Sequence, residues 1–204
     1  MTSLTETKGR TRRGGRGAGK RILNAASELF YCEGINATGV ERIASNASVS
    51  KRTLYQHFPS KTALVEEYLC QLRQEAGEDE GTPGHKSDTT PRAQLLALFD
   101  IADGDDARMR GCPFHNAAVE ASGAMPGVEH IVHLHKRAYV DGLINLAREA
   151  GAGDPEMLGN QLALLYEGAS ALSISLNDPA PWPRARAAAE ALISMWLPLP
   201  EPRR

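Results

Sequence analysis

The chain has few aromatic residues and no long apolar segment. Phe, Trp and Tyr together make up 5% of its 204 residues, whereas alanine and leucine are plentiful, and this composition favours helices over sheets. No stretch approaches the roughly 20 consecutive apolar residues that a membrane-spanning helix requires. We therefore expect an all-α protein with no membrane partner.

Cysteine is also scarce. The chain contains three cysteines, which lie far apart and form no CxxC pair: Cys32, Cys70 and Cys112. A disulfide framework and a structural zinc site both require paired or clustered cysteines, so the sequence favours neither and fits a reducing, cytoplasmic environment. The basic N-terminal segment is not followed by the apolar core of a secretion signal, which agrees with that expectation.

Motifs typical of enzymes are absent as well. The sequence contains no GxSxG, P-loop, GxGxxG or HExxH pattern. His130 and His133 lie three residues apart, but a zinc site would need a third ligand facing the same point, such as Cys112 or His115. We therefore expect no enzyme activity, no metal and no cofactor. An enzyme that uses the C-terminal His and Cys residues is the alternative.

The net charge of −2 conceals an asymmetry along the chain. Residues 1–61 contain eleven Lys and Arg against four Asp and Glu, whereas the remainder contains twelve against twenty-one. The first 17 residues lack apolar periodicity and carry five of the basic side chains: Lys8, Arg10, Arg12, Arg13 and Arg16. This pattern predicts a disordered basic arm at residues 1–17 and an N-terminal end that binds a polyanion.

Four helical patterns follow the arm. Apolar residues recur at three- and four-residue intervals from about residue 18, and Gly34 ends the first pattern. Thr38 and Glu41 form a Thr-x-x-Glu capping box, which predicts the start of a second helix. Ser50 is the predicted N-cap of a third helix, and Ser60 is that of a fourth.

The second and third helices are joined by about three residues, which predicts a helix-turn-helix whose second helix enters the major groove of DNA. Leu54 and Phe58 lie four residues apart and face inward. The other side of the third helix carries groups that suit phosphate oxygens and base edges: Lys51, Arg52, Thr53, Tyr55, Gln56 and His57. A helical hairpin with a solvated polar face is the alternative that this pattern alone leaves open.

A longer motif favours the helix-turn-helix over the solvated helical hairpin. Residues Ala37 to Lys61 contain Val49-Ser50-Lys51-x-Thr53-Leu54-Tyr55-x-His57-Phe58-x-x-Lys61 and closely resemble the DNA-binding domain of the TetR family of bacterial transcriptional regulators. The likeness covers about residues 18–72, with one departure at Ser48, where the family more often has glycine. It implies an all-α homodimer, with a three-helix helix-turn-helix domain at residues 18–64 and a larger helical effector-binding and dimerisation domain at residues 65–204.

The resemblance also implies roles for single residues. Tyr55, His57 and Lys61 match positions that usually contact the phosphate backbone, and Thr38 matches a further phosphate contact at the start of the second helix. The remaining residues expected to bind DNA match positions that reach bases or nearby phosphates, or cap the third helix: Ser50, Lys51, Arg52, Thr53 and Gln56. The expected partner is a double-stranded operator in the bacterial nucleoid.

Polar loops at about 76–91 and 104–110 interrupt the remaining helical pattern. The segment Gly111 to Glu120 resembles the start of a ligand-pocket helix in one branch of the family, and a long helix is expected from about Val128 to Ala150. The effector pocket is expected at Cys112, Phe114, His115, Tyr139 and Tyr166. Cys112 is either a buried structural residue or a sensor of electrophiles or oxidants.

The last two predicted helices carry apolar stripes with small residues between them, from Glu156 to about Leu176 and after a Pro-rich turn at 178–183. Each apolar stripe is wider than packing against one neighbouring helix requires. The two helices are therefore predicted to pair with the same two helices of a second protomer, which gives a four-helix bundle across a twofold axis. Plain intrachain core is the alternative. The residues expected at the interface are Leu162, Leu165, Ala169, Leu172, Leu192, Ile193 and Trp196.

These expectations describe a dimeric repressor that leaves a palindromic operator when a small apolar effector binds its C-terminal domain. The fourth helix, from Lys61 to about Gln74, is expected to act as a lever, with Tyr68, Leu69 and Leu72 facing the effector domain. An electrophile or redox sensor acting through Cys112 and an architectural DNA binder without an effector are the alternatives.

Overall fold

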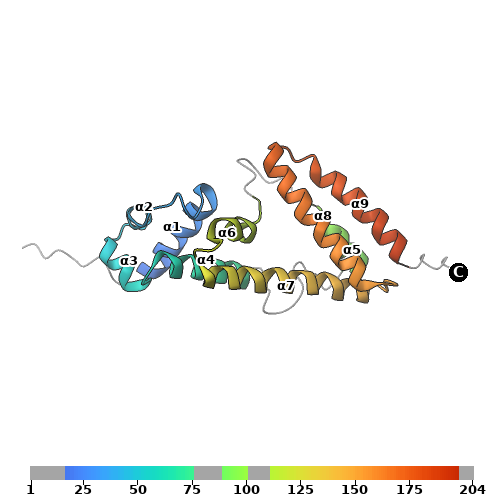
Figure 1. The fold of residues 1–204 in the computed structure, drawn as a ribbon, viewed down its shortest axis with the longest axis horizontal. Coiled ribbons are helices and arrows are strands. Elements are labelled where there is room, and N and C mark those ends of the chain that lie inside the picture. The colour runs from blue at the N-terminus through green and yellow to red at the C-terminus, as the bar shows by residue number, and fades with distance from the viewer. Residues whose placement is uncertain (1–16, 76–88, 101–110, 198–204) are drawn as a thin grey trace, which may run out of the picture. The chain divides into compact units, whose positions relative to one another are not determined.

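The computed structural model of the chain describes residues 17–75, 89–100 and 111–197. All regular secondary structure in these ranges is helical, which confirms the predicted all-α class. Most of the predicted arm and of the two predicted polar loops lies outside the described residues. In chain order, as labelled in Figure 1, the helices are α1 (Ala18–Glu33), α2 (Val40–Asn46), α3 (Lys51–His57), α4 (Lys61–Glu75), α5 (Pro91–Ala97), α6 (Pro113–Ala121), α7 (Pro126–Glu149), α8 (Pro155–Leu176) and α9 (Pro181–Trp196).

The chain divides into two compact units, Met1–Tyr68 and Leu69–Arg204, and the division falls inside α4. The first unit holds α1, α2, α3 and the first turns of α4. The second holds the end of α4 and the helices from α5 to α9. No helix in the described part of either unit has the length and apolar character needed to cross a membrane.

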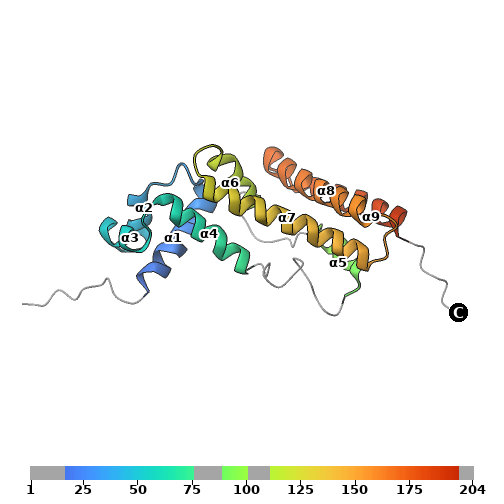
Figure 2. The same ribbon diagram turned by 60° about the horizontal axis from the view of Figure 1, so that its bottom comes forward.

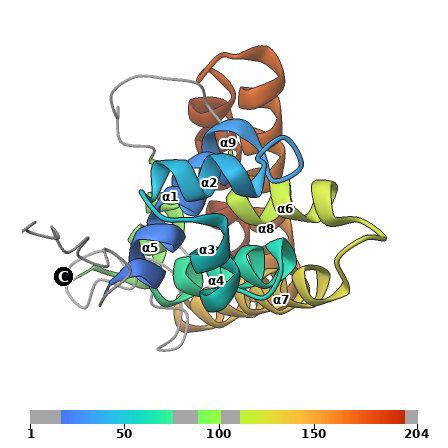
Figure 3. The same cartoon turned by 90° about the vertical axis from the view of Figure 1, so that its left-hand side faces the viewer.

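The first unit is built on the inward side of α1, against which α2 and α3 pack (Figure 3). The inward residues of α1 repeat at helical spacing and are buried: Ile22, Ala26, Leu29 and Phe30. Ile43 from α2 and Leu54 from α3 are fully buried. The Tyr68 ring of α4 lies 5.8 Å from the Phe30 ring, centroid to centroid. Tyr68 therefore packs within the first unit, which corrects the prediction that it faces the C-terminal domain.

The long helix α7 is the central element of the second unit (Figures 1 and 2). Helices α5 and α6 contact α7, α8 packs along it, and α9 lies against α8 and α5. Each large apolar side chain buried in this core contributes about 1.5–3 kcal/mol, so burial of this set is the main source of the unit's stability. The largest fully buried residues include Leu143, Leu158, Leu162 and Ile193.

Helices α7 and α8 approach each other most tightly at a glycine. A Cβ added at Gly159 would lie 2.6 Å from Ile144 Cγ1 and 2.8 Å from the Ile144 backbone nitrogen and Cα. A flexible side chain can move away from such a contact, but backbone atoms of a packed helix cannot do so without separating the helices. The absence of a side chain at Gly159 therefore sets the distance between α7 and α8.

Every helix from α5 to α9 begins at a proline. The first helical position has no intrahelical partner for its N–H, and the proline ring fixes φ near the helical value, so proline is favoured there. The sequence predicts a turn at residues 178–183, whereas α9 begins at Pro181. The turn is shorter than predicted because a proline in the first turn of a helix favours the helix instead of breaking it.

Candidate functional site

The third helix is held by its cap and by one inward side chain. As predicted, Ser50 is the N-cap of α3, and its hydroxyl oxygen accepts a hydrogen bond from the Thr53 backbone N–H at 3.0 Å. Leu54 is fully buried. A helix of seven residues is not stable in isolation, so these two contacts fix the direction in which its outer side points.

The outward side of α3 presents polar and aromatic groups to solvent. Thr53 is half-buried, and so is Lys61, the first residue of α4. Tyr55 leaves 42% of its surface exposed, although a large aromatic ring usually gains free energy by burial. Cations, an amide and a phenol on one side of a helix suit both phosphate oxygens and base edges. The exposed residues of α3 are Lys51, Arg52, Tyr55, Gln56 and His57.

An ion pair joins α2 to the start of α3. The Lys51 ammonium donates a hydrogen bond to Glu41 Oε1, and both side chains are more than half exposed. This hydrogen bond, together with the charge of Lys51, lowers the pKa of Glu41, and the carboxylate in turn raises the pKa of Lys51. This ion pair has no signal in the sequence, because a separation of ten residues across a turn has no helical periodicity.

The turn between α2 and α3 contains a strained residue. Ser48 has a φ of 52°, in the left-handed region that glycine adopts freely and that costs other residues about 1–2 kcal/mol. This backbone conformation is the physical reason why glycine suits the position better. The Arg21 Nε–H of α1 donates to the Ala47 carbonyl at 3.2 Å and holds the turn against the first helix.

Thr38 does not occupy its predicted place. The N-cap of α2 is Gly39, and no side chain caps this helix. Thr38 is fully buried, and its hydroxyl lies 2.8 Å from the Gly34 carbonyl oxygen and 3.3 Å from that of Leu29. The capping-box prediction is therefore wrong. The Thr38 hydroxyl satisfies carbonyls at the end of α1. The phosphate contact predicted at the start of α2 stays a prediction.

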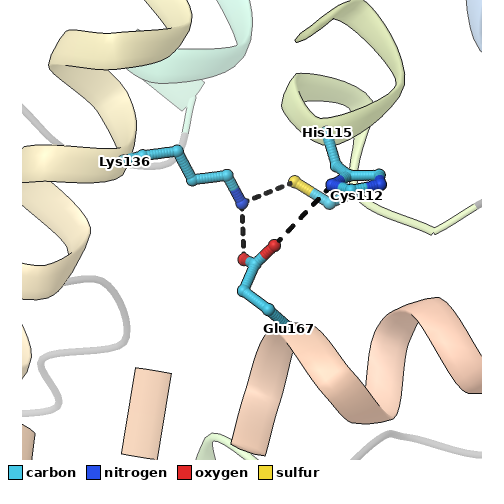
Figure 4. Close-up of polar contacts among 4 residues, drawn as sticks. All are labelled: Cys112, His115, Lys136 and Glu167. Atoms are coloured by element: carbon cyan, nitrogen blue, oxygen red, sulfur yellow. Dashed lines mark hydrogen bonds and ion pairs between the residues drawn. The ribbon is translucent and has the colours of Figure 1, made fainter. Parts of the chain in front are cut away.

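Four polar side chains meet at the junction of α6, α7 and α8, and we call them the Cys112 cluster (Figure 4). The Lys136 ammonium of α7 donates to Glu167 Oε1 of α8 at 2.5 Å and to Cys112 Sγ at 3.6 Å. His115 Nδ1 lies 4.0 Å from the other carboxylate oxygen of Glu167. Cys112 and His115, both predicted pocket residues, lie together around a Lys136–Glu167 pair that the sequence did not predict.

Tyr139 adds an unpaired hydroxyl beside this cluster. The residue is 8% exposed, and its Oη has no hydrogen-bond partner among the described residues. Burial raises the pKa of Tyr139, and the charges of Tyr166, Glu167 and Cys112 raise it further. The Tyr139 hydroxyl therefore stays protonated at neutral pH. A buried hydroxyl without a partner costs about 1–3 kcal/mol and marks a place where an acceptor would bind.

Aromatic rings surround the predicted pocket residues. The Tyr166 ring lies 5.5 Å from the Tyr139 ring and 5.2 Å from the Trp182 ring, centroid to centroid. Phe114 is buried and stacks on His135 at 3.5 Å with an interplanar angle of 8°. His130 and His133 are exposed on α7. Among the described residues, no three His, Cys, Asp or Glu side chains are grouped so that they could hold a metal ion.

The predicted dimer-interface residues lie mostly in the core of their own chain. Part of the predicted stripe is therefore intrachain core, whereas pairing of these helices across a twofold axis stays a prediction. Within the predicted set, Leu172 alone is exposed, at 54%. The Trp196 Nε1–H donates to Gln161 Oε1 at 3.0 Å. The residues buried in or packed against the core are Leu162, Leu165, Ala169, Leu192, Ile193 and Trp196.

Helix α8 carries a different apolar stripe on its exposed side, which we call the outer stripe: Leu164, Gly168, Leu172 and Leu176. These residues repeat every four positions, and Leu164 is 74% exposed. A Cβ added at Gly168 would meet no described atom within 4 Å. Apolar side chains that line up and remain exposed in a single chain are typical of an interaction surface.

The first unit therefore has the geometry of a helix-turn-helix DNA-binding protein: two short helices joined by a tight turn, with the second presenting a basic, polar side. A family model described as "Bacterial regulatory proteins, tetR family" matches residues 22–68. The solved structure of SCO4454, a TetR-family transcriptional regulator from Streptomyces coelicolor, is similar with a TM-score of 0.77 and 28% identity. The match covers 90% of this chain and 97% of that one.

Curated relatives agree with this likeness. The HTH-type transcriptional regulator SrpR from Pseudomonas putida is 27% identical over 91% of this chain and 86% of SrpR. The HTH-type transcriptional activator FasR from Mycolicibacterium smegmatis is 36% identical over 96 residues. The match covers 44% of this chain and less than half of FasR, 42% of its length. Residues 22–68 therefore match the DNA-binding region of the TetR family, and most of the chain is similar to a TetR-family transcriptional regulator and to the HTH-type regulator SrpR.

Proposed function

We propose that the chain is a TetR-family regulator that acts as a dimeric repressor, which an effector releases from a palindromic operator. The observation that carries the proposal is the outer side of α3, where Lys51, Arg52 and Gln56 are exposed on a helix fixed by a cap and a buried leucine. A helix so fixed can enter a major groove in one register. Repression needs no further contact, because a protein bound across a promoter excludes polymerase by occupying the site.

Selection of bound fragments from genomic DNA tests the DNA-binding part of the proposal. We expect a palindromic site whose half-sites lie about one helical turn of DNA, or a multiple of it, apart. Arg52→Ala and Gln56→Ala should each relax the preference at particular base pairs by about 1–3 kcal/mol. Lys61→Ala should weaken all sequences alike and reduce the salt slope by about one. Folded variants that bind the selected site as the parent does would overturn the assignment.

The outer stripe supports pairing of two protomers through α8. Leu172→Glu places a charge on this stripe, and because Leu172 is exposed in the single chain, the fold should stay intact. We expect at least about a tenfold weaker dimer in sedimentation, because an unpaired charge at an interface is costly. Val119→Glu on α6 is the matched control, since Val119 is an exposed apolar residue outside the stripe, at 67% against 54% for Leu172. Equal dimerisation of both variants would place the interface elsewhere.

The effector is proposed to bind beside Phe114, Tyr139 and Tyr166 in the second unit. Support comes from the aromatic rings there and from the unpaired Tyr139 hydroxyl, which together suit a largely apolar molecule with one polar group. Binding of effector and DNA must be reciprocal: an effector that weakens DNA binding by some factor binds the DNA complex more weakly by the same factor. Titration of a candidate with and without operator measures this directly, and equal affinities exclude that candidate as an inducer.

A further inference from the structure

Three features converge on the sulfur of Cys112. The residue is the N-cap of the nine-residue helix α6, where backbone N–H groups and the helix dipole favour negative charge. The Lys136 ammonium donates a hydrogen bond to Sγ at 3.6 Å (Figure 4). A helix N-terminus and a lysine ammonium are the surroundings in which cysteines of proteins act as nucleophiles.

The buried Tyr139 hydroxyl is the second, independent observation. It has no partner among the described residues. Tyr139 lies one turn after Lys136 on the same side of α7, where Lys136 contacts both Cys112 and Glu167, and its ring is 5.5 Å from that of Tyr166, the neighbour of Glu167 on α8. A protonated hydroxyl without a partner provides a donor for an oxygen atom that the chain itself does not supply. The sulfur nucleophile and this hydrogen-bond donor therefore suit a ligand that has an electrophilic carbon and, near it, an acceptor oxygen.

We propose that Cys112 forms a covalent adduct with apolar α,β-unsaturated carbonyl compounds, and that the Tyr139 hydroxyl donates to their carbonyl oxygen. The Tyr166 ring next to Tyr139, and the Trp182 ring that packs against Tyr166, suit the apolar part of such a molecule. As a means of regulation, the adduct rests on the proposed effector function. The reaction itself does not, because it depends only on the second unit.

The step is an addition that needs no oxidant or reductant. Sulfur gives its proton to water and attacks the β-carbon; the S–C bond forms as the C=C π bond breaks, and the electron pair moves to the carbonyl oxygen. The Tyr139 O–H stabilises the enolate that results, as a donor placed where charge develops. The α-carbon then takes a proton from water, so that the net change is addition of S–H across C=C.

Labelling with benzylideneacetone tests the reaction, and benzylacetone, which has the same carbonyl but no C=C bond, is the matched inert compound. Cys32 is the control inside the protein, because it is exposed whereas Cys112 is half-buried. If exposure governed the rate, Cys32 would react first. We expect peptide mass mapping to show one enone on Cys112, formed at least about tenfold faster than on Cys32. Labelling of Cys32 at an equal or greater rate overturns the proposal.

Two variants distinguish activation of the reaction by neighbouring groups from simple access of the reagent to Cys112. Tyr139→Phe keeps the buried ring and removes only the donor, so labelling of Cys112 by benzylideneacetone should slow at least about tenfold. Iodoacetamide alkylates sulfur without forming an enolate, so its rate at Cys112 should not change in this variant. Lys136→Gln removes the ammonium and should slow both reagents at Cys112, with Cys32 unaffected in each case. Equal slowing of both reagents in Tyr139→Phe would mean that the hydroxyl does not act on the carbonyl.

The proposed effect of the adduct on DNA binding is tested separately, by measuring the affinity of the protein for the selected operator before and after labelling. We expect the labelled parent to bind the operator at least about tenfold more weakly, and Cys112→Ser to be unaffected by the reagent. Selective labelling without any change in DNA binding would keep the reactive site and exclude its role as a switch. Loss of operator binding in unlabelled protein would instead contradict the proposed function itself.

Discussion

The two units of the chain place their polar groups in opposite ways. In the first unit they stand on the exposed side of a short helix whose other side is anchored by Leu54. In the second, Lys136, Glu167 and Tyr139 gather where three helices meet beside a hydrophobic core. An exposed side follows from local periodicity, whereas a cluster made by three helices depends on how closely they pack. The comparison predicts that the second unit is the more sensitive to small changes in helix spacing.

The largest effect is expected at the closest approach of α7 and α8. Gly159→Ala would place a methyl group against the Ile144 backbone and should lower the free energy of unfolding by about 2–3 kcal/mol. Gly168→Ala in the same helix should raise it by about 0.5–1 kcal/mol, because it gains helix propensity and meets no described atom. Urea unfolding measures the free energy of unfolding of each variant, at protein concentrations where the two variants have the same oligomeric state by sedimentation. A stable Gly159→Ala variant would show that α7 and α8 separate easily.

The buried hydroxyl of the first unit gives the next largest effect. Thr38→Val removes the hydrogen bonds to the Gly34 and Leu29 carbonyls and should lower the free energy of unfolding by about 1–2 kcal/mol. Thr53→Val, at a less buried site, should change it by less than about 0.5 kcal/mol, since the partner of the Thr53 hydroxyl in the described part of the chain is the exposed Ser50 hydroxyl. Similar losses in both variants would contradict the structural role assigned to Thr38.

A stabilising change is expected in the turn. Ser48→Gly relieves the left-handed backbone and should raise the free energy of unfolding by about 1 kcal/mol. Ser45→Gly, three residues earlier and inside α2, is the same chemical change in a helical position and should lower it by about 0.5–1 kcal/mol. Thermal unfolding of both distinguishes backbone strain from a general effect of glycine. The two shifts must have opposite signs.

The smallest effect concerns the exposed ion pair. Glu41→Gln frees Lys51 and removes a negative charge beside it, so affinity for random-sequence DNA should rise a few-fold and the salt slope should steepen by about one. Because Lys51 lowers the pKa of Glu41, the difference from the parent is complete at neutral pH and shrinks only as the pH falls through that lowered value. In a Lys51→Gln background, the same substitution should leave the slope nearly unchanged. Filter binding over a salt series measures each slope.

The sequence predicted the site of the first unit better than that of the second. The helix-turn-helix was predicted from features within a few residues of each other, such as the Ser50 cap and the inward Leu54, and the structure confirms these. Thr38 was assigned wrongly, because a threonine three residues before a glutamate has the same pattern whether its hydroxyl caps the next helix or closes the previous one. That distinction depends on where the chain turns between them.

In the second unit, periodicity found the helices but not which apolar stripe faces the core. Helix α8 is apolar on both sides, so Leu162 and Leu164 have the same local signal although one is fully buried and the other exposed. Lys136 and Glu167 were missed because an ion pair between two long helices has no signature in either one. Only the packing of α7 against α8 decides both questions.

The burial of Leu162, Ala169 and Ile193 by their own chain has a consequence at the level of the cell. A protomer that buries these residues by itself does not need a partner to complete this part of its core, so the pairing proposed through the outer stripe would follow mass action and would not be coupled to folding. Below the dissociation constant of such a dimer, its concentration rises with the square of the number of protomers. Copy number would then act as a second input to the switch, and a change in expression would move the threshold at which the effector works.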